Sequence, residues 1–191
     1  IAGLAQAIKV NQDNHPDISK QVYDFHQEAI IPLQIRQVAW GEIDTSDTCN
    51  ILLTGATGFF GAFILRTLLQ NTHSTIYCLV RAVNTEEGRQ RIMNNLIEYS
   101  PSEDHAHTRI KVFIGDLEKS QLGLTVNEYT FLSENIDIIY HNGGMVNFVA
   151  PYISHKDANV QGTLELIKLC NSNKNKVLHY ISTTHVLNQL D

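Results

Sequence analysis

The sequence has no apolar run of the length that a membrane-spanning helix needs. Its first residues also lack the basic stretch, apolar segment and cleavage site of a secretory signal. The three cysteines, Cys49, Cys78 and Cys170, are odd in number and far apart, which favours reduced core thiols over a disulfide framework. Basic residues do not predominate, since the formal net charge is −6. We therefore expect a soluble, cytoplasmic protein that binds neither membrane nor nucleic acid.

The first quarter of the chain lacks the regular pattern of the rest. Residues 1–10 have the apolar spacing of a helix, and residues 11–48 are a polar linker with one short helical pattern near 22–31, which Pro32 ends. With 191 residues, 43% of them hydrophobic, the chain is long enough for one full core and a small appendage. We interpret residues 1–10 as the possible tail of a preceding domain.

Residues 49–191 alternate between apolar runs and helical patterns. The expected strands are 50–54, 75–80, 110–115, 136–141 and 177–182, and the expected helices are 59–71, 85–99, 126–134 and 154–172. This alternation predicts an α/β fold, a doubly wound parallel Rossmann sheet covered on both faces. Right-handed crossovers give the order 3-2-1-4-5 and a ligand crevice at the carboxyl ends of the first and fourth strands. Such domains usually continue, so we expect this one to be truncated after its fifth strand.

A glycine-rich turn follows the first expected strand. Glycines there let the backbone bend and let a pyrophosphate approach the main chain, while the next helix offers unpaired N–H groups. Alone, such a turn is also compatible with a plain strand-to-helix connection. The G-x-x-G-x-x-G spacing resembles that of the extended short-chain dehydrogenase/reductases. The residues expected to bind a cofactor here are Thr54, Gly55, Thr57, Gly58, Phe59, Phe60 and Gly61.

The residue at the end of the second strand distinguishes the two nicotinamide dinucleotides. An acidic residue about 20 positions past the glycines binds the ribose 2′-hydroxyl of NAD. Arg81 occupies that place, and its planar, permanently charged guanidinium suits a 2′-phosphate. The sequence therefore predicts NADPH. Arg91, in the next helix, is a candidate for a second clamp, with a surface role as the alternative.

Two glycine-containing triplets follow later strands. Residues 115–117 (GDL) end the third strand, where a carboxylate can lie beside the adenine. Residues 142–144 (NGG) end the fourth strand, where small residues permit a close approach to the nicotinamide ribose. Each triplet alone is a common loop, but in this order after a glycine turn they are specific. The residues expected to contact the cofactor there are Asp116, Leu117, Asn142, Gly143 and Gly144.

With these residues in place, the sequence resembles the thioester reductase domains of nonribosomal peptide and polyketide synthetases and the carboxylic acid reductases. The likeness covers about residues 28–186, and its most specific blocks are HNGGMVNF at 141–148 and NVQGT at 159–163. Residues 1–8 resemble the last helix of an acyl or peptidyl carrier domain. The resemblance implies that hydride from NADPH reduces a carrier-bound phosphopantetheine thioester to an aldehyde, which some relatives reduce further to an alcohol.

The resemblance also implies a catalytic Ser or Thr after the fifth strand, a Tyr, and a Lys four residues beyond the Tyr. The hydroxyl and the phenol stabilise the developing oxyanion, and the lysine lowers the pKa of the phenol. The family pattern places the hydroxyl on Thr183, at the cofactor site, with Ser182 and Thr184 as near alternatives. Asn159 matches a helix asparagine that helps to order water near the lysine.

One pair in the chain imitates the catalytic Tyr and Lys. Tyr152 and Lys156 have the right spacing, but they precede the fifth strand. No Tyr or Lys follows Thr183, so we expect the true pair beyond Asp191. No metal site is expected, because His105 and His107 lie in a polar loop without further ligands at metal spacing.

Two other functions stay open. One is a different extended short-chain reductase, such as a sugar-nucleotide epimerase or dehydratase, against which the carrier-like start and the HNGG block speak. The other is a non-catalytic NADPH-binding module, which a stop codon after Asp191 would favour. The fifth strand would lie at the sheet edge without its usual neighbours, so we also expect a possible dimer through that edge.

Overall fold

The computed structural model of the chain describes residues 23–32, 48–99 and 106–184. The chain divides into two compact units, Ile1–Ile30 and Ile31–Asp191. The possible carrier tail at residues 1–10 lies outside the described residues, so the predicted domain boundaries stay predictions. None of the described helices combines the length and the apolar character that crossing a membrane requires.

The described part of the first unit contains one short helix, α2 (Phe25–Glu28). Asp24 caps it, because its side chain accepts hydrogen bonds from the backbone N–H groups of His26 and Gln27. The helix is shorter than the predicted 22–31. Phe25 is 59% exposed, so little packing supports a longer helix.

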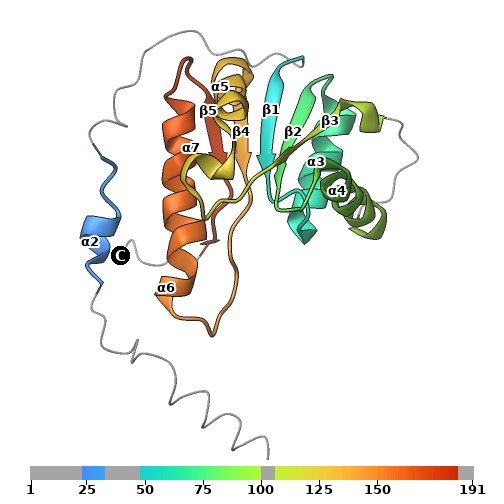
Figure 1. The fold of residues 1–191 in the computed structure, drawn as a ribbon. Helices are drawn as coiled ribbons and strands as arrows, with labels where there is room; N and C mark the ends of the chain where they lie inside the picture. The colour runs from blue at the N-terminus through green and yellow to red at the C-terminus, as the bar shows by residue number, and fades with distance from the viewer. Residues whose placement is uncertain (1–22, 33–47, 100–105, 185–191) are drawn as a thin grey trace, which may run out of the picture. The chain divides into compact units, whose positions relative to one another are not determined.

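The second unit is built on a five-stranded parallel sheet in the order β3-β2-β1-β4-β5 (Figure 1). Its strands are β1 (Asn50–Thr54), β2 (Thr75–Val80), β3 (Ile110–Ile114), β4 (Ile138–His141) and β5 (Val177–Tyr180). The predicted doubly wound Rossmann order is therefore confirmed. The strands β4 and β5 are shorter than predicted, although the N–H of Ile181 still donates to the carbonyl of His141.

Helices cover both faces of the sheet. The pair α3 (Phe59–Asn71) and α4 (Thr85–Tyr99) lies on one face, and α5 (Val126–Asn135) and α7 (Gly162–Cys170) lie on the other (Figure 1). Successive residues of β1 point to opposite faces, as the pleat requires. Ile51 and Leu53 join the core under α3 and α4, whereas Leu52 joins the core under α5 and α7. Two short 3-10 helices, η3 (Ala106–Arg109) and η4 (Ser120–Gly123), flank β3.

The prediction of one regular helix at 154–172 is wrong in two respects: the helix starts earlier, and it is not α-helical throughout. It begins as α6 (Tyr152–His155) directly after Pro151, whose fixed φ suits a residue before a helix. It continues as a π-helix, η5 (Lys156–Gln161), before α7 restores the α-helical turn. A π-turn widens the helix locally and is common at functional sites.

Candidate functional site

A pocket of about 510 Å³ lies at the carboxyl ends of the strands, where the order of the sheet reverses. Segments that are far apart in the sequence meet there: the turn after β1, the ends of β2 and β3, and the loop after β4. Its lining residues are Thr54, Gly55, Thr57, Gly58, Phe59, Phe60, Leu79, Arg81, Arg91, Gly115, Asp116, Leu117, Glu118, Asn142, Gly143, Gly144, Met145, Val146 and Ala158. Of the residues expected at the cofactor, Gly61 and Thr183 are outside this lining.

The glycine turn is shaped by its first and last glycines. Gly55 has a φ of 74°, and a Cβ there would lie 2.8 Å from the backbone of Asn142 and Gly143. A Cβ on Gly61 would lie 2.0 Å from the carbonyl oxygen of Gly55. Both positions therefore require glycine, the first for its conformation and the last for close packing. This explains why Gly61 is buried in α3 and does not line the pocket.

The middle glycine is different, because a Cβ on Gly58 would meet only the carbonyl oxygen of Gly55, at 3.4 Å. The bare backbone at Gly58 therefore faces open space in the pocket. Gly58 is also the N-cap of α3, where no side chain caps the helix and no acidic residue stands in the first turn. The first N–H groups of α3 are thus left for an anion, which fits a dinucleotide pyrophosphate.

A side chain from α4 holds this turn from behind. The buried amide of Asn95 donates hydrogen bonds to the carbonyls of Ala56 and Gly58, each at 2.9 Å. These bonds connect the turn to α4. The glycine cradle, which is made of the turn from Gly55 to Gly58 and the start of α3, therefore has a fixed shape before any ligand binds.

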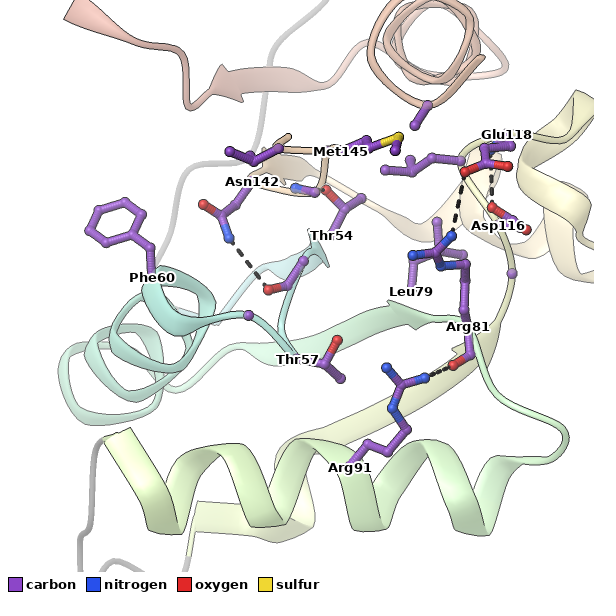
Figure 2. Close-up of a pocket in the computed structure, with 18 of the residues that line it drawn as sticks. Thr54, Thr57, Phe60, Leu79, Arg81, Arg91, Asp116, Glu118, Asn142 and Met145 are labelled. Carbon is purple, nitrogen blue, oxygen red and sulfur yellow. Dashed lines mark hydrogen bonds and ion pairs between the residues drawn. The ribbon is translucent and has the colours of Figure 1, made fainter. Parts of the chain in front are cut away.

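Charged side chains gather at one end of the pocket. Figure 2 shows Arg81, Glu118 and Asp116 there, with Phe60 and Asn142 at the other end. Arg81 Nη1 lies 3.4 Å from Glu118 Oε1. Arg91 donates from Nη1 to the backbone carbonyl of Arg81, so both predicted arginines come together at the pocket.

A buried hydrogen-bond chain lies beneath the glycine turn. Thr163 donates its hydroxyl proton to the carbonyl of Asn159, so it can only accept from His141 Nε2, which is 3.1 Å away. The neutral ring of His141 then accepts at Nδ1 from Thr54 Oγ1, at 2.8 Å. Thr54 in turn accepts from the N–H of Gly143, at 2.8 Å. Burial lowers the pKa of His141 to about 4, which keeps this ring neutral.

The π-helix contributes a second connection. Asn159 Oδ1 accepts from the N–H of Met145 at 2.7 Å, and its Nδ2 donates to the carbonyl of Met145 at 2.9 Å. The amide thereby holds the loop that forms the wall of the pocket after β4. The predicted role of Asn159 in ordering catalytic water stays a prediction. Thr183 lies three residues beyond Tyr180, the end of β5, and is exposed.

Sequence reasoning missed several residues of this site. Glu118 directly follows the predicted Asp116 and Leu117, so the turn itself was a signal. Met145 likewise continues a predicted triplet. Asn95 had no signal, because nothing in α4 marks which of its residues faces the glycine turn.

The chain is similar to known proteins in both sequence and structure. Residues 53–191 match an NAD-binding family described as male sterility protein. The chain is 49% identical over 142 residues to a linear gramicidin synthase of Brevibacillus parabrevis, a match that covers 74% of this chain and 3% of that protein.

Among solved structures, the terminal R domain from the myxalamid PKS-NRPS biosynthetic pathway is 43% identical, with a TM-score of 0.78. That match covers 85% of this chain and 42% of that one. A thiolation-reductase di-domain from an archaeal non-ribosomal peptide synthetase is 25% identical, with a TM-score of 0.64, over 78% of this chain and 31% of that one. The chain thus spans between 3% and 42% of the length of these three proteins.

Proposed function

Since the chain belongs to the NAD-binding family described as male sterility protein, we propose that it is the NADPH-binding portion of a thioester reductase. The resemblance predicted from the sequence is confirmed by this family match and by the similar R domains. A different activity, such as that of a sugar-nucleotide epimerase, is not favoured, because the similar solved structures described above are an R domain and a thiolation-reductase di-domain. The nicotinamide cofactor is common to the family, and we add NADPH as the form that this chain prefers.

One observation supports the proposal most strongly: the glycine cradle and Arg81 line the same pocket. The bare backbone at Gly58 and the start of α3 would hold the pyrophosphate, and Arg81 would hold the adenosine 2′-phosphate. Asp116 would lie beside the adenine, and the backbone at Asn142 and beyond would lie beside the nicotinamide ribose. The bound cofactor would supply the hydride chemistry.

The substrate that we propose is an acyl or peptidyl thioester on the phosphopantetheine arm of a carrier domain. Its reduction releases the thiol and leaves an aldehyde. Thr183, just beyond β5, would donate a hydrogen bond to the oxygen on which negative charge develops. The similarity to a thiolation-reductase di-domain supports a carrier domain as the partner. We propose the cytoplasm as the location of this reaction.

The test is a calorimetric titration of the chain with NADPH and with NADH, beside the Arg81→Ala variant. We expect NADPH to bind at least about tenfold more tightly, and Arg81→Ala to remove most of that difference, because the guanidinium meets only the 2′-phosphate. Lys111→Ala is the matched control, since it removes an exposed positive charge from β3 outside the pocket. Equal affinity of the unaltered chain for both dinucleotides would contradict the proposal.

A further inference from the structure

The arginine that we assign to the 2′-phosphate already has an acidic partner in the pocket. Arg81 Nη1 and Glu118 Oε1 are 3.4 Å apart, and both residues line the cavity (Figure 2). The two side chains are 69% and 44% exposed, so the pair lies at the mouth of the cavity and not in the core. A ligand phosphate that reaches Arg81 therefore encounters the carboxylate of Glu118 at the same place.

The backbone of Glu118 is held in position by its turn. Its N–H donates to Asp116 Oδ1 at 3.1 Å, and the N–H of Asp116 donates to the carbonyl of Leu122 at 2.7 Å. The preceding residue, Leu117, packs against α7 so closely that a Cβ on Gly162 would lie 2.8 Å from its carbonyl oxygen. The turn has little room to withdraw, so the Glu118 carboxylate stays within reach of Arg81 when a ligand arrives.

The backbone of Arg81 is also secured. Arg91 donates to the Arg81 carbonyl, which fixes the main chain from which the Arg81 side chain extends. The two charged side chains can still move in solvent, but their backbones keep them paired across the pocket mouth. The carboxylate of Glu118 and the phosphate of a ligand therefore compete for the Arg81 guanidinium.

We propose that Glu118 tunes cofactor selectivity by competing with the adenosine 2′-phosphate for Arg81. A 2′-phosphate must displace the carboxylate or lie beside it as a like charge, and either lowers its affinity. The uncharged 2′-hydroxyl of NADH leaves the ion pair intact and can donate to the carboxylate, as it does to the acidic residue of NAD-binding sites. Glu118 thus narrows the preference for NADPH over NADH. This inference rests on the proposed function.

The experiment compares Glu118→Gln with the unaltered chain by calorimetry, using NADPH, NADH and adenosine 2′,5′-bisphosphate as ligands. We expect the variant to bind NADPH and the bisphosphate about threefold to tenfold more tightly, a modest gain because the pair is exposed. NADH should bind equally or less tightly. Glu134→Gln is the matched control, since it removes the same charge from an exposed position near the end of α5, outside the pocket, and should change nothing.

A double variant shows whether Glu118 acts through Arg81. In the Arg81→Ala background, Glu118→Gln should give a smaller gain in NADPH affinity than in the unaltered chain, because only the repulsion between the carboxylate and the 2′-phosphate remains to be relieved. An undiminished gain there overturns competition for Arg81. Suppose that Glu118→Gln changes the ratio of NADPH affinity to NADH affinity by less than about twofold from that of the unaltered chain, whereas Arg81→Ala removes most of the preference. This inference then fails and the proposed function stands. If neither NADPH nor the bisphosphate binds any of these proteins, both proposals fail.

Discussion

At the scale of single residues, His141 connects the structural and the functional parts of the site. Its ring lies between Thr54, at the end of β1, and Thr163, on α7. Through Thr54 it also fixes the N–H of Gly143, which lines the pocket. The residue is 1% exposed and acts as a neutral donor and acceptor. It is a positioning residue for the backbone that would meet the nicotinamide ribose.

The buried imidazole predicts a dependence of stability on pH. Burial lowers the pKa of His141 in the folded chain to about 4, whereas the unfolded chain binds the proton near pH 6.5. Between these values the unfolded state takes up more protons, so this contribution is complete above pH 6.5 and is lost as the pH falls towards 4. The loss amounts to about 3 kcal/mol of unfolding free energy.

Urea unfolding at a series of pH values measures this effect. Carboxylates also titrate at the acidic end of the range, so the unaltered chain is compared with His141→Asn, which lacks the titratable ring. The difference in unfolding free energy between the two should shrink as the pH falls from 6.5. His155→Gln, on a partly exposed histidine of α6, is the control. A difference that does not vary with pH would contradict the prediction.

At the scale of elements, two glycines at the start of α3 have different roles: Gly61 affects the stability of the fold, and Gly58 affects the binding of the dinucleotide. Gly61 is buried at the start of α3, against the carbonyl of Gly55, whereas the side-chain position of Gly58 is open. Alanine usually stabilises a helix relative to glycine by up to about 1 kcal/mol. The packing at Gly61 should reverse that sign.

We expect Gly61→Ala to lower the unfolding free energy by about 2 kcal/mol, because α3 must move away from the turn. Gly58→Ala should leave the melting temperature nearly unchanged but weaken dinucleotide binding by about tenfold or more, because its methyl group enters the cradle. Thermal unfolding and calorimetry on both variants measure the two effects. Unchanged binding by a folded Gly58→Ala variant would show that the pyrophosphate does not lie at this backbone.

At the scale of the whole molecule, the sheet ends at β5, which pairs with β4 on one side. Val177 donates its N–H to the carbonyl of Asp137, and Ile181 donates to that of His141. Because N–H groups alternate along a strand, those of Leu178 and Tyr180 point away from β4. No described strand pairs with that outer side, so the edge can template another strand.

We therefore predict that the chain of 191 residues dimerises or exchanges segments through this edge. Light scattering over a range of concentrations should show a mass above that of the monomer at high concentration. Tyr180→Pro removes one outward N–H without breaking the ladder to β4, and it should shift the mass towards the monomer. A monomeric mass of the unaltered chain at the highest concentration would refute the prediction.

Much of this protein follows from its sequence alone. The alternation of apolar strands and helices predicted the five-stranded order, because right-handed crossovers leave few ways to arrange such elements. The spacing of Gly55, Gly58 and Gly61 predicted the cradle, and the position of Arg81 at a strand end predicted its place in the pocket. The strands, the helices and the turn are local features, since each depends on a residue and its neighbours, and the order of the strands follows from the crossover rule.

The tertiary structure decided what depends on contacts between distant segments. Glu118 lies 37 residues from Arg81, and Asn95 lies 39 from Ala56, so no periodicity in the sequence could pair them. The hydrogen-bond chain through His141 likewise needs β1, β4 and α7 to be packed together. Side-chain partners of this kind are set by the packing of whole elements, which a local pattern does not specify.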